Sequence, residues 1–329
     1  MTHRARWARC AGVAGVVGVL VSLAAQPSRA QGVRAVLPAP ADAAVFTGDL
    51  DATERALYAA SRRSPREPAT RGALGAWLAS RGQLRTGAVL LEESRLFGGD
   101  PTAIAARLAH VYTWLRDWAS LAALPASPLS PGEKMRARVL AERGSEVIGA
   151  DTVVVPFAPL ELGALGRVPL LVGTDTLWAE VDPQAEGLTL PGLRLGAGQV
   201  EVFGDDGRGL VVIVREISFG ALTLRNLPAR VDGSLGVGRA RMGFDVFAML
   251  APTVDSRAGT VTLRRSGRVE ARARATGLPV VLGFPGVRLA VRQGELLAPI
   301  TSPAGRSALR ARPWTVDLQR GMIWVDAAR

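Results

Sequence analysis

The sequence changes its character near residue 150, and this change constrains the fold more than any other feature. Between about residues 51 and 143, Ala, Leu, Arg and Glu recur at spacings of three and four residues, which is the period of an amphipathic helix. From Thr152 onward, short runs of Val, Ile, Leu and Thr are separated by Gly and Pro, as in domains built from short strands. We therefore predict an α+β multidomain protein with an all-α helical-repeat module over 50–145 and an all-β domain over 150–268. The expected linker covers residues 144–150.

Residues 1–30 have the pattern of a secretory signal peptide. Three arginines precede an uncharged run over residues 10–25, and Ser28-Arg29-Ala30 offers small residues at the two positions that a signal peptidase recognises. We therefore expect an exported protein, periplasmic or extracellular, with a membrane tether only if the signal stays uncleaved. Residues 31–49, rich in Pro and Ala, are expected to form an extended lead-in.

The chemical inventory of the chain is short and excludes several kinds of site. Cys10 is the only cysteine, and His3 and His110 are the only histidines, so the mature chain lacks the residues for a multi-histidine metal site or a Cys-His pair. We expect no metal and no cofactor, and we expect His110 to be a packed or surface residue without a catalytic partner. The net charge of +11 comes from scattered arginines without interleaved aromatic residues, so we expect no nucleic-acid partner.

The helical region carries a loose internal repeat. Leu74-Gly75 and Gly87 align at a 34-residue offset with Leu108-Ala109 and Leu121. A period of 34 residues with small residues at helix crossings resembles the tetratricopeptide repeat, and the resemblance covers roughly residues 50–125. A plain antiparallel helical bundle is the alternative.

In the β region, one acidic residue stands where a strand is expected to end. Two apolar runs, 168–172 and 177–181, flank a turn at Gly173, and Asp182 follows the second run. A glycine-rich segment at 204–209 and a Gly243-Phe244-Asp245 motif come later. This order is similar to that of the retropepsin-like aspartic peptidases across about residues 155–265.

The resemblance implies a role for each of these segments. Asp182 corresponds to the catalytic aspartate of that family, and the site loop after it consists of Pro183, Gln184 and Ala185. Gly204, Asp205, Asp206 and Gly207 correspond to the tip of the flap, the hairpin that covers the substrate. Gly243-Phe244-Asp245 corresponds to the later motif.

The catalytic motif itself departs from the family, which has Asp-Thr/Ser-Gly where this chain has Asp182-Pro183-Gln184. Pro183 removes both the hydroxyl group and a backbone N–H, and Gln184 adds a Cβ where the family's tight turn has glycine. Two carboxylates must share one proton in this chemistry, with one holding water and the other polarising the carbonyl. We therefore expect a degenerate site.

The C-terminal residues repeat part of the β domain. The segment starting at Leu278-Pro279 resembles the one starting at Val168-Pro169, and Arg292 and Asp182 each follow 13 residues after the proline. We predict that residues 277–329 form a shortened second β lobe with Arg292 as the counterpart of Asp182. An ion pair between the two would keep Asp182 from sharing a proton.

These patterns predict an exported aspartic-peptidase-like protein that is catalytically degenerate and binds a peptide or protein. One alternative is an active aspartic endopeptidase that works as a homodimer through Asp182. A second alternative is a structural protein of the cell envelope.

Overall fold

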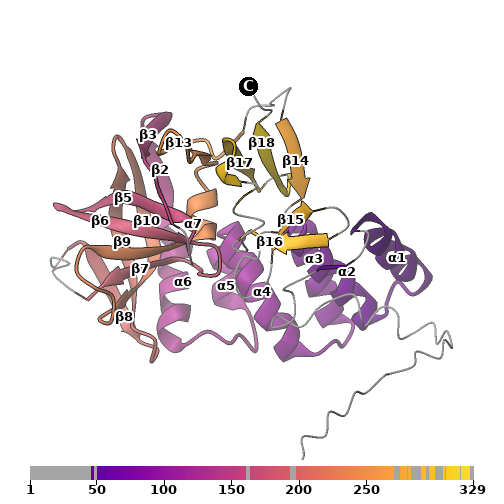
Figure 1. Cartoon of the computed structure of the whole chain (residues 1–329). Coiled ribbons are helices and arrows are strands. Elements are labelled where there is room, and N and C mark those ends of the chain that lie inside the picture. Colours follow the sequence, from indigo (N-terminus) through magenta and orange to yellow (C-terminus); the bar gives the residue numbers. More distant parts are fainter. Residues whose placement is uncertain are drawn as a thin grey trace, which may run out of the picture.

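The computed structural model describes residues 46–47, 50–160, 164–192, 198–269, 275–279, 281–282, 290–293, 296–300, 307, 309–318 and 320–326. The expected signal peptide, and the lead-in up to residue 45, lie outside the described residues. After the two-residue strand β1 (Phe46–Thr47), helices come first in the described chain and the other strands follow, so the protein is α+β (Figure 1).

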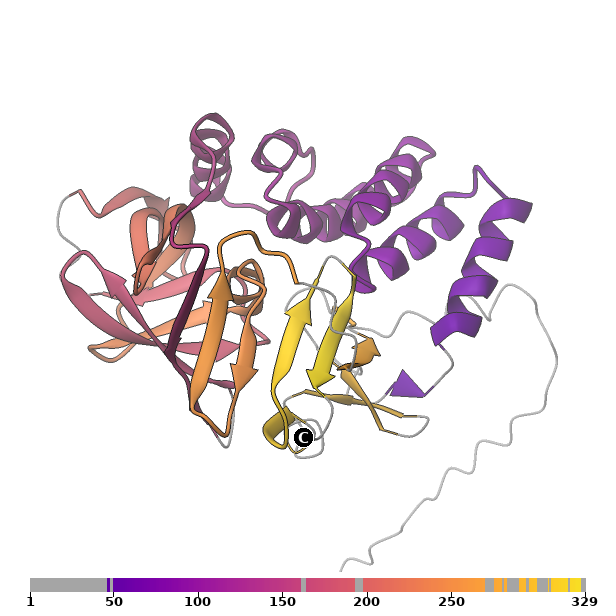
Figure 2. The ribbon, with the colours of Figure 1, turned by 90° about the horizontal axis from the view of Figure 1, so that it is seen from above.

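The helical module spans residues 50–143 of the described chain. Its helices are α1 (Leu50–Arg63), α2 (Pro68–Ser80), α3 (Leu84–Leu96), α4 (Pro101–Leu115), α5 (Trp118–Ala123) and α6 (Pro131–Arg143). Proline stands at the start of α2, α4 and α6, where its missing N–H and fixed φ suit the first turn. The helices form an arc that runs along one side of the strands (Figure 2).

The 34-residue period corresponds to helix starts, because α1, α3 and α5 begin at Leu50, Leu84 and Trp118. Small residues stand where α2 crosses α3, as the sequence predicts. A Cβ atom on Gly87 would lie 2.7 Å from the Gly75 carbonyl oxygen, so only glycine allows the two backbones to come this close. The assignment to tetratricopeptide repeats stays a prediction.

The β domain is a nine-stranded sheet that closes on itself. Its strands are β2 (Glu146–Gly149), β4 (Ala158–Pro159), β5 (Gly166–Val172), β6 (Asp175–Asp182), β7 (Leu188–Pro191), β8 (Val200–Asp205), β9 (Leu210–Phe219), β10 (Leu222–Asp232) and β11 (Arg239–Gly243). Closure follows because β9 pairs with β5 on one side and with β10 on the other. The short helix α7 (Phe244–Ala248) follows β11 directly.

The expected linker is in part a strand. Residues 146–149 form β2, which pairs antiparallel with β10 at the edge of the nine-stranded sheet. A four-residue strand with only intermediate burial at its centre gives little periodicity in the sequence, which explains why this region resembled a linker.

The sheet brings the two expected site motifs to one place. Strand β6 pairs in parallel with β11, and the register sets Asp182 opposite Gly243. Strand β7 lies between β11, to which it is antiparallel, and β10, to which it is parallel. The loop 183–187 and the start of α7 therefore meet at the same end of these strands.

A second sheet has an internal two-fold pattern. Its order is β14 (Ala275–Pro279), β18 (Met322–Asp326), β17 (Trp314–Asp317), β12 (Thr253–Asp255), β13 (Thr260–Arg264) and β3 (Thr152–Pro156). The hairpins β12–β13 and β17–β18 meet at the centre, where Thr253 pairs with Thr315 and their hydroxyl oxygens lie 2.8 Å apart. Strands β3 and β14 form the two matching edges.

This register gives Pro279 a different counterpart from the one that the sequence suggested. Pro279 lies opposite Met322 on β18, and Pro156 lies opposite Thr260 on β13. Because the two hairpins are equivalent in the sheet, Pro279 corresponds to Pro156 and not to Pro169. Arg292 was matched to Asp182 because each follows 13 residues after a proline, Pro279 or Pro169. The strand pairing does not support this match.

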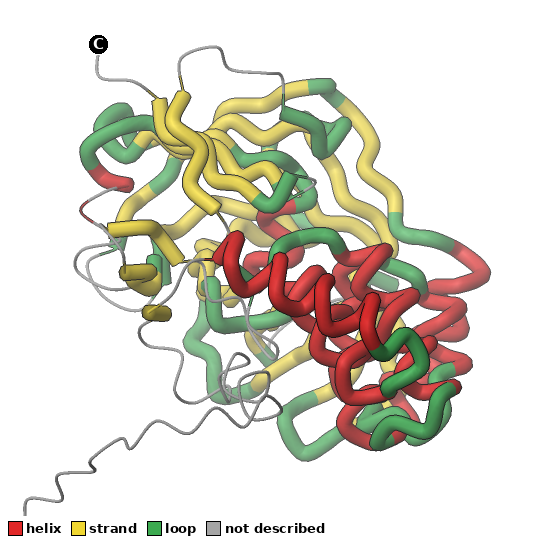
Figure 3. The backbone as a smooth tube through the Cα atoms, turned by 90° about the vertical axis from the view of Figure 1, so that its right-hand side faces the viewer, coloured by secondary structure: helices red, strands yellow, loops and turns green. Residues whose placement is uncertain are grey.

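The two modules share an interface built on α6. Helix α6 packs against β8, β9 and β10, and Ile213 of β9 belongs to the same buried cluster as the α4, α5 and α6 side chains. Figure 3 shows the helices gathered together beside the strands. Gly132 allows close approach, since a Cβ there would lie 2.7 Å from the Phe203 carbonyl oxygen of β8. In the described part of the chain, no helix has the length and apolar character needed to cross a membrane.

Candidate functional site

The loop after Asp182 is a compact turn held by local hydrogen bonds. The Asp182 carboxylate accepts a hydrogen bond of 2.8 Å from the Gln184 N–H, and the Ala185 N–H donates to the Asp182 carbonyl at 3.2 Å. Pro183 fits this turn because it has no N–H to satisfy. The expected site loop, residues 183–185, therefore forms a turn at the end of β6.

The Asp182 carboxylate faces a cation. The Arg241 Nε atom lies 3.9 Å from it, and the side chain of Asp182 is 28% exposed. Arg241 belongs to β11, the strand that pairs with β6. Within the described residues, no second carboxyl group is hydrogen-bonded to Asp182.

Asp245 of the later motif lies behind this loop and is partly buried. Its carboxylate accepts a hydrogen bond of 2.9 Å from the Gly187 N–H, and the Gly243 N–H donates to the Gly187 carbonyl at 2.6 Å. A Cβ on Gly243 would lie 2.4 Å from that carboxylate, so glycine is required there. Burial, together with the negative charge of Glu186, raises the pKa of Asp245 to about 7.

Glu186 connects the loop to the helical module. Its carboxylate is hydrogen-bonded to the His110 Nδ1 atom at 2.8 Å and accepts a hydrogen bond of 3.2 Å from the Trp114 Nε1–H. Both of these residues belong to α4. Burial alone would lower the pKa of His110, but the hydrogen bond and the charges of Glu186 and Asp245 raise it above its ordinary value. His110 thus has an acidic partner, contrary to the sequence-based expectation.

The β8–β9 hairpin, which the sequence analysis expected to be a flap, is held to α6 by an ion-pair network. Arg230 of β10 binds Asp206 at the hairpin tip and, at 2.5 Å, Glu133 of α6. The side chains of Asp206 and Glu133 are 3% and 9% exposed, so both carboxylates are largely removed from water. Burial would raise the pKa of Asp206, but the Arg230 guanidinium holds it below its ordinary value. The other tip residues, Asp205 and Gly207, are exposed.

Glu133 reaches this position because of how α6 begins. Ser130 and Glu133 form a capping box, in which the Ser130 hydroxyl accepts from the Glu133 N–H and the Glu133 carboxylate accepts from the Ser130 N–H. The same carboxylate then pairs with Arg230 through its other oxygen. A local helix-starting signal therefore fixes a side chain that contacts the flap.

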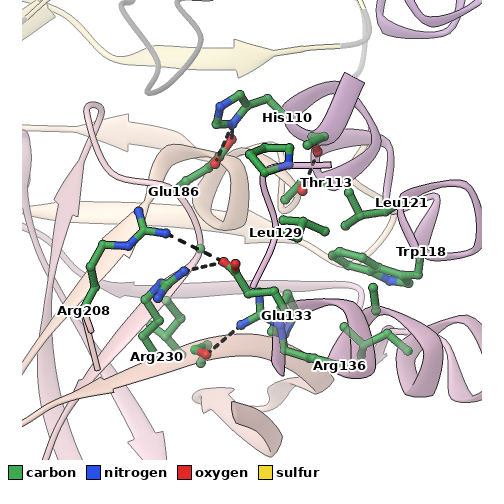
Figure 4. Close-up of a pocket in the computed structure, with 18 of the residues that line it drawn as sticks. His110, Thr113, Trp118, Leu121, Leu129, Glu133, Arg136, Glu186, Arg208 and Arg230 are labelled. Atoms are coloured by element: carbon green, nitrogen blue, oxygen red, sulfur yellow. Dashed lines mark hydrogen bonds and ion pairs between the residues drawn. The ribbon is translucent and has the colours of Figure 1, made fainter. Parts of the chain in front are cut away.

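Four of these residues, His110, Glu133, Glu186 and Arg230, line a cavity of about 450 Å³ between the two modules. Figure 4 shows His110 and Glu186 meeting on one side of it, and Glu133 with Arg208 and Arg230 on another. Trp118, Leu121 and Leu129 of the helical module supply apolar walls. Gln184, Gly187 and Leu188 bring the loop after Asp182 and the start of β7 into the lining.

Asp182 is not among the described residues that line this cavity. Arg292 lies on β15 (Ala290–Gln293), in a separate sheet with β16 (Leu296–Pro299) and β1 (Phe46–Thr47). Asp182 belongs to the nine-stranded sheet, and its ion pair is with Arg241. Across the part of the chain that the structure describes, no group of three or more His, Cys, Asp or Glu side chains is arranged to hold a metal ion.

Sequence reasoning missed Glu186, Glu133 and Arg230. Glu133 carried a recognisable signal, the capping box Ser-x-x-Glu at the start of a helix. The partners of Glu186 are 72 and 76 residues away in sequence, so no local spacing could have revealed them.

Comparisons with known proteins add little to this geometry. No protein-family model and no curated protein matches the chain. One solved structure, a retropepsin-like aspartic protease from Rickettsia conorii, is 14% identical to this chain, with a TM-score of 0.24. The match covers 36% of this chain and 93% of that protein. Because this similarity is low, we base the functional proposal on the geometry of this chain.

Proposed function

We propose that this chain is an exported, aspartic-peptidase-like protein that has lost catalysis and binds a peptide or protein segment in the cavity between its two modules. The observation that carries the proposal is that cavity itself, lined jointly by α4–α6, by the loop after Asp182 and by β10 next to the flap. Its volume of about 450 Å³ lies within the range of roughly 300–1,000 Å³ that is typical of ligand pockets.

The contacts of Asp182 argue against peptidase chemistry. Its carboxylate accepts from the Gln184 N–H and lies near Arg241, whereas the reaction needs a second carboxyl group that shares its proton. Pro183 also removes the hydroxyl group that the family uses.

The cavity walls suit a ligand with both apolar and polar groups. Trp118, Leu121 and Leu129 offer apolar surface, while Arg208, which is 74% exposed, and Gln184 stand at its polar side. A peptide segment presents both kinds of group, with apolar side chains beside backbone donors and acceptors.

Binding is tested with residues 31–329 and a library of fluorescent eight-residue peptides, read by anisotropy. We expect a subset of peptides to bind, and we expect Thr113→Trp, which fills the cavity, to abolish binding. Val237→Trp, on a loop residue that is 78% exposed, is the matched control and should bind normally. Failure of the whole library to bind, or equal binding by Thr113→Trp, would refute the proposal and favour a purely structural role in the cell envelope.

Catalysis is tested separately with unfolded casein from pH 3 to pH 8. We expect no cleavage. Cleavage by the wild-type protein that disappears in Asp182→Asn would instead establish an active aspartic endopeptidase. Sedimentation of that active species would then show whether it is a homodimer.

Export is tested by expressing the full chain in a Gram-negative bacterium. We expect the protein in the periplasmic fraction with a new N-terminus at Gln31. A cytoplasmic, full-length product would contradict this part of the proposal.

A further inference from the structure

A second cavity, of about 670 Å³, lies on a different side of the interface between the modules. The turn between α2 and α3, the end of α4, helix α7 and the turn after β13 all contribute to it. Its charged lining residues are Arg85, Arg116, Arg265 and Asp245.

Arg116 is a half-buried arginine that lines this cavity. It caps the end of α4 in the left-handed region, with φ of 54°, and its side chain is half-buried. Within the described residues, its guanidinium makes no hydrogen bond and no ion pair. Burial lowers the pKa of Arg116 to about 10, and the charge of Asp245 opposes this only in part.

Arg85 adds a second cation of the same kind. It lies in the first turn of α3, is exposed, and forms no hydrogen bond or ion pair in the described part of the chain. Thr86 lines the cavity beside it and brings a hydroxyl group. Arg265 differs from these two residues because it already pairs with Asp151.

The charges in this cavity do not balance. Among its described lining residues are three guanidinium groups and one carboxyl group, that of Asp245. The Asp245 carboxyl group already accepts a hydrogen bond from the Gly187 N–H. The Glu133 and Asp206 carboxylates that balance arginines in the other cavity have no equivalent in this lining.

We propose that this cavity is a binding site for a compact oxyanion, a phosphate or carboxylate group, held by Arg116 and Arg85. Guanidinium groups bind such anions through paired N–H donors, and charge-assisted hydrogen bonds of this type are stronger than neutral ones. The Thr86 hydroxyl adds a neutral donor. This inference is independent of peptide binding in the cavity beside Gln184.

The test is thermal unfolding of residues 31–329 in potassium phosphate, in potassium succinate and in potassium chloride at equal ionic strength. Phosphate and succinate separate the two sources of the oxyanion, and chloride measures general screening of a basic protein. We expect phosphate or succinate to raise Tm more than chloride does. Titration calorimetry with the effective anion then gives Kd.

Arg116→Gln and Arg85→Gln should each weaken this Kd at least about tenfold, because each removes one charged donor pair. Arg138→Gln, on the exposed face of α6, is the matched control for the loss of one positive charge and should bind like the wild type. Arg85 is exposed, so Arg85→Gln decides the question if Arg116→Gln fails to fold. Equal stabilisation by all three salts, or unchanged binding in Arg85→Gln, would overturn the proposal.

Discussion

Replacing Asp245 with Asn should change how the stability of this protein depends on pH. Asp245 is partly buried, and its carboxyl group has a pKa of about 7 in the folded chain against an ordinary value of 3.8. A carboxyl group whose pKa is raised by folding stabilises the fold at low pH, and this contribution is lost as the pH rises from 3.8 to about 7. Asn cannot ionise and can still accept from the Gly187 N–H.

The size of the effect follows from the shift. Between pH 5 and pH 8 the wild-type protein should lose about 3 kcal/mol of unfolding free energy through this one group, at 1.36 kcal/mol per pH unit. Asp245→Asn should not show that loss. The variant should therefore gain about 3 kcal/mol relative to the wild type over this interval.

Urea unfolding followed by tryptophan fluorescence at pH 5, 6, 7 and 8 measures this difference. Asp205→Asn, at the exposed tip of the flap, is the control for removing one carboxylate and should follow the wild-type curve. If the free-energy difference between Asp245→Asn and the wild type stays constant from pH 5 to pH 8, the reasoning about Asp245 is wrong.

Three further predictions concern packing and the contacts between the modules. Gly87→Ala should lower the unfolding free energy by about 2 kcal/mol, because its Cβ would meet the Gly75 carbonyl, whereas Gly233→Ala, which meets nothing, should be neutral. Glu133→Gln should speed proteolysis at residues 205–209, because it removes the charge that holds Arg230 and so loosens the flap; an unchanged cleavage rate would contradict the ion-pair network. His110→Ala should cost more stability at pH 5.5 than at pH 8.5. A histidine whose pKa is raised by folding stabilises the folded state at pH values below its ordinary pKa of 6.5. This stabilisation is lost as the pH rises through the pKa of His110 in the folded protein. Chemical denaturation at both pH values measures the difference, and an equal cost would refute the pairing with Glu186.

The sequence predicted those features that depend on local spacing. The three- and four-residue spacing of apolar residues indicated the helices, and Gly75 and Gly87 marked a crossing of two helices. The turn at Gly173 was also predicted correctly. Each of these is determined by residues within one or two turns of chain.

The features that the sequence did not reveal depend on tertiary contacts. Glu186 meets His110 only because α4 packs against the loop after β6, and a strand as short as β2 is defined by its pairing with β10 rather than by its own periodicity. The counterpart of Pro279 depends on strand register, which a match between short apolar runs cannot determine.

The two-fold pattern of the six-stranded sheet has a consequence for how the protein responds to dilution. The hairpin β17–β18 pairs with β12 from within the same chain, so β12 is not left as a free edge for another molecule. An intramolecular partner is present at an effective concentration fixed by the connecting chain and not by the amount of protein in solution. The fold around Thr253 and Thr315 should therefore keep the same Tm from nanomolar to micromolar protein, unlike an assembly that gains stability by mass action.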